Sequence, residues 1–100
     1  MDYLLQLFKA LANPKRVQII EYLLCNGETH IEVIAKDLKI PLATCCRNLK
    51  ILEKVYLVIS RIKNGKAFYS IKNPAEHPYR EKLIELVKQK RQNNLLLLLI

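Results

Sequence analysis

The side chains that can do chemistry in this sequence are mostly basic, and they are concentrated in the middle of the chain. Residues 36–72 carry nine Lys or Arg side chains and two acidic ones, a net charge of +7. The flanking segments, residues 1–35 and 73–100, carry net charges of −1 and +2. Basic groups bind phosphate oxygens, so this distribution points to nucleic acid first and to an anionic membrane surface second. A solvated charged face is the alternative.

Catalytic side chains do not form a recognisable set. The two histidines, His30 and His77, lie far apart in the chain, and no glycine-rich phosphate loop is present. We therefore expect no enzymatic activity and no bound cofactor. Cys45 falls at a core-facing position of an expected helix and should act as a small hydrophobe. Cys46 should be partly exposed near Arg47, where we favour an inert thiol over a redox sensor.

Length and composition indicate one domain over residues 1–100. The chain is 51% hydrophobic and has only two glycines, which argues against disorder. Its longest apolar run, residues 95–100, is far shorter than the roughly 20 residues that cross a bilayer. The N-terminus shows no signal-peptide pattern. Three cysteines, two of them adjacent, do not form a disulfide framework, so we expect a cytoplasmic protein with no membrane partner.

Hydrophobic periodicity predicts four helices in the first half of the chain. They span residues 2–12, 14–26, 29–38 and 42–54. Asn13-Pro14 is typical of a helix start, and Thr29 with Glu32 matches a capping box for the third helix. The third and fourth helices, joined by a short turn that contains Pro41, predict a helix-turn-helix.

The second half predicts a β-hairpin and a last helix. Strands over residues 57–63 and 66–72 flank Asn64-Gly65, a strong hairpin signal, and the last helix should begin at Pro78. The fold class is mainly α with a small β-hairpin, in the order α-α-α-α-β-β-α. In this register Lys63 faces Lys66, and like charges there are destabilising. Neutralisation by phosphates is favoured over two lysines that extend into water.

The chain resembles the ArsR/SmtB-type winged helix-turn-helix transcriptional regulators over residues 7–71. Residues 7–16, LFKALANPKR, are similar to that family's entry into its second helix, and residues 38–52, LKIPLATCCRNLKIL, are similar to its helix-turn-helix. Arg61, Gly65 and Tyr69 stand where the wing usually carries these types. The resemblance implies a homodimer that binds double-stranded DNA. Helix 42–54 would enter the major groove, the wing, residues 57–72, would contact the backbone, and residues 1–12 and 78–100 would form the dimer interface.

Two sets of residues follow from this reading. The expected DNA-binding residues are Thr44, Arg47, Asn48 and Lys50 in the groove, and Lys36, Lys39, Lys54, Arg61, Lys63 and Lys66 on phosphates. The expected dimer interface consists of Tyr3, Leu4, Leu7, Tyr79, Leu83, Leu86 and Val87.

The chain departs from the family pattern at several positions. Tyr56 stands where the family often has glycine, so the turn after the fourth helix is expected to differ. Many relatives bind metal through a Cys-x-Cys in the third helix, whereas this chain offers only Cys25, His30 and Glu32. We therefore favour a regulator without a metal site over a metal-responsive one.

Other functions stay open at the level of sequence. A non-specific architectural or chromatin-type DNA-binding protein, a redox-responsive repressor and a protein-interaction module are the alternatives. The role of the aliphatic tail, residues 95–100, is also open between dimer packing, a loose membrane contact and no role at all.

Overall fold

The structure, a computed structural model, describes residues 2–99. The helices and strands follow the predicted order, with one short strand added before the third helix. In chain order they are α1 (Tyr3–Leu11), α2 (Pro14–Asn26), β1 (Thr29–His30), α3 (Ile31–Leu38), α4 (Leu42–Lys54), β2 (Val58–Lys63), β3 (Lys66–Ile71), the 3-10 turn η1 (Pro74–Glu76) and α5 (Pro78–Leu99). The fold class, mainly α with a small β-hairpin, is confirmed.

The start and end of α2 confirm the signals in the sequence. The Asn13 side chain accepts hydrogen bonds from the backbone N–H groups of Lys15 and Arg16, at 3.0 and 3.2 Å. Pro14 occupies the first helical position, where its missing N–H costs nothing. At the other end Gly27 has a φ of +72°, a conformation that favours glycine.

The predicted capping box at Thr29 is wrong. Thr29 and His30 form β1, which pairs with Tyr69 and Phe68 of β3, and α3 begins only at Ile31. The Thr29 hydroxyl donates to the carbonyl of Gly27 at 2.9 Å instead of serving the helix. Backbone pairing with β3 thus takes the residues that local sequence assigned to a helix cap.

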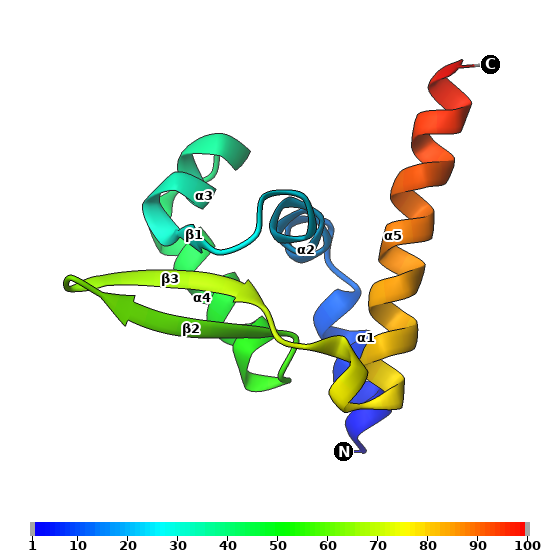
Figure 1. The fold of residues 1–100 in the computed structure, drawn as a ribbon, viewed down its shortest axis with the longest axis horizontal. Helices are drawn as coiled ribbons and strands as arrows, with labels where there is room; N and C mark the ends of the chain where they lie inside the picture. Colours follow the sequence, from blue (N-terminus) through cyan, green and yellow to red (C-terminus); the bar gives the residue numbers. More distant parts are fainter. Residues whose placement is uncertain (1, 100) are drawn as a thin grey trace.

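The hairpin has the predicted register, with Val58 opposite Ile71 and Lys63 opposite Lys66. The strand order is β1-β3-β2, so β3 lies in the centre of a three-stranded antiparallel sheet. Val58 and Tyr69 are buried, but Ile62, on the same side of the hairpin, is 71% exposed. Ile62 lies next to the hairpin turn, and Figure 1 shows that this end of the hairpin projects beyond the helices.

The core is a single cluster to which all five helices and the hairpin contribute. Residues such as Leu7, Ile20, Ile34 and Leu49 have no exposed surface at all. Cys45 is also fully buried, which confirms its predicted core-facing position. Dense packing of this kind fixes the orientation of α4 relative to the rest of the molecule.

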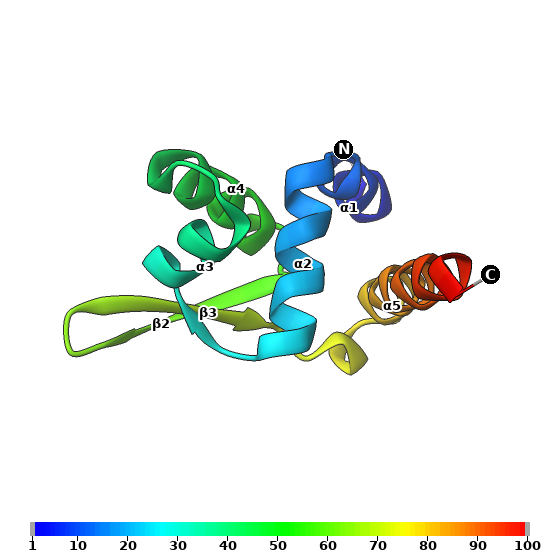
Figure 2. The ribbon, with the colours of Figure 1, turned by 90° about the horizontal axis from the view of Figure 1, so that it is seen from above.

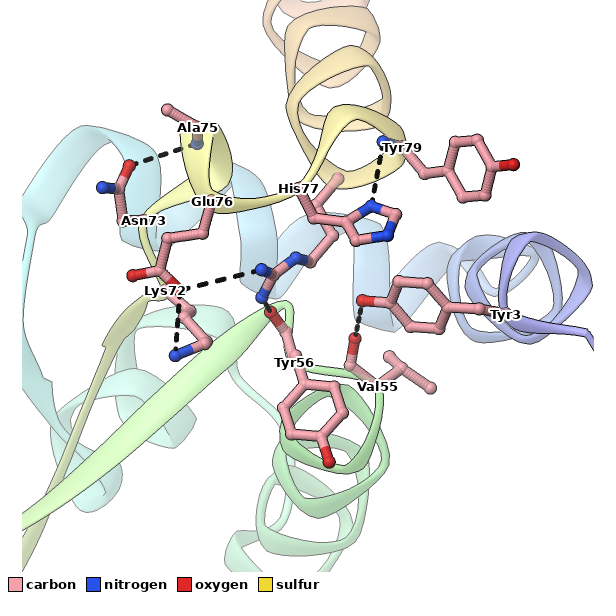
Figure 3. Close-up of polar contacts among 10 residues, drawn as sticks. Tyr3, Val55, Tyr56, Lys72, Asn73, Ala75, Glu76, His77 and Tyr79 are labelled. Carbon is pink, nitrogen blue, oxygen red and sulfur yellow. Dashed lines mark hydrogen bonds and ion pairs between the residues drawn. The ribbon is translucent and has the colours of Figure 1, made fainter.

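The turn between α4 and β2 was expected to differ from the family pattern, because Tyr56 replaces a glycine there. Instead, the turn keeps a backbone conformation that favours glycine. Tyr56 adopts the left-handed conformation, with a φ of +63°. Two hydrogen bonds hold this turn against the first and last helices: Tyr3 Oη donates to the carbonyl of Val55, and Arg80 Nη1 donates to the carbonyl of Tyr56, both at 2.8 Å (Figure 3). These contacts stabilise a backbone conformation that is unfavourable for tyrosine.

The elements gather at two ends of the molecule. In Figures 1 and 2, α3, α4 and the hairpin lie at one end and α5 at the other, with α2 between them. Leu95–Leu99 continue α5 and are 52 to 83% exposed. Ile100, the last residue of the aliphatic tail, lies outside the described residues. In the part of the chain that the structure describes, no helix is long and apolar enough to cross a membrane.

Candidate nucleic-acid interface

The helix-turn-helix places one face of α4 outward. Its turn depends on Lys39, which has a φ of +57° and ends α3. The N–H of Lys39 is hydrogen-bonded to the carbonyl of Lys36 and that of Ile40 to the carbonyl of Ala35, at 3.2 and 3.0 Å. The inner side of α4 is buried against the core through Cys45, Asn48, Leu49 and Leu52.

The outward face of α4 is basic. Ala43, Arg47, Lys50 and Lys54 follow one another at helical spacing, and all four are exposed. Thr44 is half-buried at the edge of this face. The residues around a surface depression of about 500 Å³ are Ala43, Cys46, Arg47, Lys50, Ile51 and Lys54. Exposed guanidinium and ammonium groups on a helix have the chemistry to contact both base edges and phosphates.

Asn48 does not belong to this outward face, which corrects its assignment as a base-reading residue. It is 6% exposed, and its side-chain oxygen accepts a hydrogen bond from Arg16 Nη1 at 3.1 Å. Arg16 also donates through Nε to the carbonyl of Ala10. Asn48 therefore joins α4 to the start of α2 and the end of α1, and cannot reach a base while it holds this position.

Two further lysines extend the basic surface across the helix-turn-helix. Lys36 and Lys39 lie at the end of α3 and in the turn, and both are exposed. Among residues 2–99, no carboxylate lies within ion-pair distance of Lys36, Lys39, Arg47, Lys50, Lys54 or Lys66. These six cations are therefore available to an external anion.

The wing carries three exposed cations, Lys66 together with Arg61 and Lys63. Lys63 and Lys66 face each other as predicted, but their repulsion is relieved in a way that the sequence did not suggest. Glu28, in the loop before β1, accepts a hydrogen bond from Lys63, and its second oxygen lies 3.1 Å from Arg61 Nε. The hydrogen bond from Lys63, helped by the charge of Arg61, lowers the pKa of the Glu28 carboxyl.

The candidate metal ligands lie in separate environments. The ring of His30 packs on Phe68 with centroids 5.4 Å apart, Cys25 contacts Arg91, and Glu32 is exposed in the first turn of α3. Within residues 2–99, no three His, Cys, Asp or Glu side chains come together as a metal site would require.

The expected interface residues on α1 and α5 divide into two groups. Leu7, Leu83 and Val87 are 0, 8 and 6% exposed within one protomer, so burial in the core already explains these three. In contrast, Tyr79 and Leu86 are 43 and 56% exposed on α5, and Tyr3 and Leu4 are half-buried. A groove of about 820 Å³ between α1, α2 and α5 is lined mainly by apolar side chains, among them Phe8, Leu11, Val17, Leu83, Leu86 and Val87.

Sequence reasoning missed three polar residues that organise this region. Arg16 binds the side chain of Asn48, Arg80 binds the carbonyl of Tyr56, and Glu28 pairs with the wing. Capping of α2 by Asn13 places Arg16 in the first turn, but nothing local indicates its partner on α4. The 6% exposure of Arg80 likewise follows only from the packed fold.

Comparison with known proteins relates the chain to bacterial and archaeal regulators. It is 37% identical over 71 residues, 71% of its length, to the HTH-type transcriptional regulator Rv0324 of Mycobacterium tuberculosis. It is 30% identical over 87 residues, 87% of its length, to the uncharacterized HTH-type transcriptional regulator MJ1398 of Methanocaldococcus jannaschii. The chain spans 31% and 22% of the lengths of these two regulators. No protein-family model matches the chain.

A solved structure extends the likeness to the whole fold. The homodimeric winged helix-turn-helix DNA-binding domain Mb0332 of Mycobacterium bovis, from a possible ArsR-family transcriptional regulator, superimposes with a TM-score of 0.77 at 31% identity. The match covers 91% of this chain and 80% of that one. The likeness holds in both sequence and fold, and the chain belongs to the ArsR family of winged helix-turn-helix transcriptional regulators.

Proposed function

We propose that the chain is a homodimeric, sequence-specific DNA-binding transcriptional regulator that works without a metal site. The outward face of α4 enters the major groove and the wing lies along the phosphate backbone. Arg47, Lys50 and Thr44 contact base edges, whereas Lys36, Lys39 and Lys54 contact phosphates. On this account the chain is a binding module rather than an enzyme, and its three free cysteines suit a reducing cytoplasm.

The observation that carries this proposal is the grouping of exposed cations. The eight basic residues expected to bind DNA are all exposed and belong to the helix-turn-helix and the wing, at the end of the molecule opposite α5 (Figure 2). A double helix presents a dense row of phosphates, so exposed cations gathered on a helix and the adjacent wing have the chemistry to bind it.

The proposed dimer uses residues 1–12 and 78–100. Exposed apolar side chains such as Phe8, Tyr79 and Leu86 lie along α1 and α5, beside the groove between these helices and α2. Their burial against a second copy would remove a substantial apolar surface from water. The Mycobacterium bovis domain, which is homodimeric, supports this assignment. A two-fold dimer would read two half-sites about one turn of DNA apart.

Selection of bound sequences from a random duplex pool tests the proposal. The full chain should enrich a palindromic motif with half-sites about one helical turn apart. Addition of Zn²⁺ should leave the motif and the affinity unchanged. Enrichment of no motif would contradict sequence-specific reading, and a metal-dependent loss of binding would contradict a regulator without a metal site.

A non-specific architectural protein is the second candidate, because apolar side chains share the outward face of α4. Leu42 and Ile51 are 47 and 37% exposed there, and apolar contacts discriminate bases weakly. Competition between the selected site and random duplex separates the two functions. A regulator shows a preference of about 10³-fold or more, and an architectural protein shows a small ratio.

A further inference from the structure

A carboxylate lies directly against the basic side chains of the wing. Glu28 precedes β1, and β1 pairs with β3, whose other neighbour is β2. In this order β3 separates Glu28 from β2, and the long side chains of two β2 residues, more than thirty positions away in the chain, reach Glu28 across β3. Glu28 accepts a hydrogen bond from Lys63 Nζ, and its other oxygen lies 3.1 Å from Arg61 Nε.

The two Glu28 oxygens use the same donors that a DNA phosphate would use. Carboxylate and phosphate both accept charge-assisted hydrogen bonds from Arg and Lys, with similar geometry. The side chains of Arg61 and Lys63 are 61 and 43% exposed, so an external anion can reach them, while that of Glu28 is 26% exposed. The Glu28 carboxyl is ionised at neutral pH, and the hydrogen bond from Lys63 lowers its pKa below the usual range.

We propose that Glu28 competes intramolecularly with the DNA backbone for the cations of the wing. In the free protein Glu28 partly neutralises Arg61 and Lys63, and in the complex its carboxylate opposes the approach of a phosphate. This inference rests on the proposed function and deepens it, because it names a residue that sets how tightly the wing holds the backbone. Since phosphates carry no sequence information, Glu28 lowers affinity for every duplex and leaves base preference unchanged.

The ion pairs of Glu28 with Arg61 and Lys63 are exposed, so they can open when DNA binds rather than serve as a fixed structural contact. Exposed ion pairs add little to stability, so release of Glu28 from Arg61 and Lys63 costs little. A DNA phosphate near the same two cations repels the carboxylate, and this repulsion weakens as salt screens it. The effect of Glu28 should therefore be largest at low ionic strength.

The test compares Glu28→Gln with Glu32→Gln. Both variants remove one negative charge near the helix-turn-helix, but in the described residues Glu32 makes no ion pair with the wing. At about 50 mM salt, Glu28→Gln should bind both the selected site and random duplex roughly three- to tenfold more tightly than wild type. The slope of log Kobs against log salt should steepen by up to about 1. Glu32→Gln should change affinity by less than about twofold.

A protein that lacks both cations shows whether the effect of Glu28 acts through Arg61 and Lys63. In an Arg61→Gln/Lys63→Gln protein, Glu28→Gln should no longer increase affinity beyond about twofold, because the competed donors are gone. Glu28→Ala should repeat the result of Glu28→Gln, and thermal unfolding of each protein checks that it is folded.

The outcomes separate the inference from the proposed function. If wild type binds DNA but Glu28→Gln binds no more tightly than Glu32→Gln, or more weakly than wild type, the competition is wrong. A gain that persists without Arg61 and Lys63 also overturns it. If wild type binds no duplex at low salt, the proposed function fails, and the inference fails with it.

Discussion

At the scale of single residues, the fold holds several non-glycine residues near the candidate site in a left-handed backbone conformation. Tyr56, Lys39 and Asn64 all have positive φ angles, at +63°, +57° and +52°. Each lies at the end of an element that presents the basic surface: α4, α3 and β2. An L-residue in this region costs about 1 kcal/mol relative to glycine, so the packing around these turns must offset that cost.

Replacement of Tyr56 tests this strain directly. Tyr56→Gly should unfold with a free energy about 1 kcal/mol higher than Tyr56→Ala, because only glycine adopts this φ without steric conflict. Both variants remove the same exposed ring, so the ring cancels in the comparison. Urea denaturation measures the difference. Equal stability of the two variants would show that the turn is not strained.

Burial of Cys45 makes the stability of the fold sensitive to high pH. Desolvation, with a smaller effect of Cys46, raises the pKa of the Cys45 thiol from about 9 to about 11. The folded state therefore holds the thiol proton more tightly than the unfolded state does. The resulting contribution to the free energy of unfolding is complete below pH 9 and is lost as the pH rises towards 11. Wild type should lose up to about 1.4 kcal/mol per pH unit more than Cys45→Ala between these values.

Urea titrations at pH 8, 9, 10 and 11 measure this pH dependence. Tyr69, whose pKa is raised mainly by burial and only last by Cys45, is present in both proteins, so most of its contribution is common to both curves. Cys45→Ala should be less stable than wild type at pH 8, since it leaves a cavity. Parallel curves for the two proteins would contradict a raised pKa of Cys45.

At the scale of elements, α4 has two faces with different tasks. Its inner face carries Asn48, which binds Arg16, and its outer face carries Arg47, which has no carboxylate partner in the described part of the chain. Adjacent positions on a helix point about 100° apart, so neighbours in sequence serve stability and recognition separately.

Two substitutions separate these faces. Asn48→Ala should lower the free energy of unfolding by roughly 1–3 kcal/mol, because it removes the acceptor of the part-buried Arg16 guanidinium. Arg47→Ala should leave stability within about 0.5 kcal/mol of wild type, since its side chain is exposed. Urea denaturation of both variants measures the effect. If Asn48→Ala were as stable as wild type, its link to Arg16 would not hold α4 in place.

Most elements could be predicted because their signals are local. The periodicity of apolar residues indicates α1 to α4, Asn13-Pro14 marks the start of α2, and Asn64-Gly65 sets the hairpin register. Each of these signals lies within or next to the element that it predicts. The strand β1 could not be predicted, because two residues show no periodicity and β3, their partner, lies almost forty positions away. Asn48 was assigned to the wrong face because its partner, Arg16, is also non-local.

The basic surface was predictable for a similar reason. Exposure follows from the helical spacing of Arg47, Lys50 and Lys54, and from their position opposite the buried Leu49 and Leu52. The contact of Glu28 with the wing could not be predicted, since it depends on the β1-β3-β2 order of the sheet. Charge counted along the chain therefore gave the location of the surface but not the acidic residue that moderates it.

At the scale of the whole molecule, the two ends differ in the chemistry of their exposed side chains. The helix-turn-helix and wing lie at the basic end, and α5 with its exposed leucines lies at the other (Figure 1). A dimer formed through α1 and α5 would leave both basic ends free and turned outward, as two half-sites on one DNA duplex require.

Substitution of Leu86 tests the proposed dimer interface without disturbing the fold of the protomer. Leu86→Lys should weaken self-association at least tenfold, because a charge replaces an apolar side chain in the proposed interface. The side chain is 56% exposed in the protomer, so folding should be preserved. Val33→Lys, which makes the same kind of change at a 43% exposed apolar position of α3, outside the proposed interface, is the matched control. Sedimentation equilibrium that gives equal association for both variants would place the interface elsewhere.

The central claim is that α4 reads bases while the wing holds the backbone, and the ratio of affinities for the selected site and random duplex tests it most directly. Arg47→Ala should lower this ratio roughly 5- to 150-fold, the effect of losing about 1–3 kcal/mol of base discrimination. Lys66→Ala should weaken binding to both duplexes alike, with an unchanged ratio and a shallower salt slope. An unchanged ratio in Arg47→Ala, or a lowered ratio in Lys66→Ala, would contradict the account.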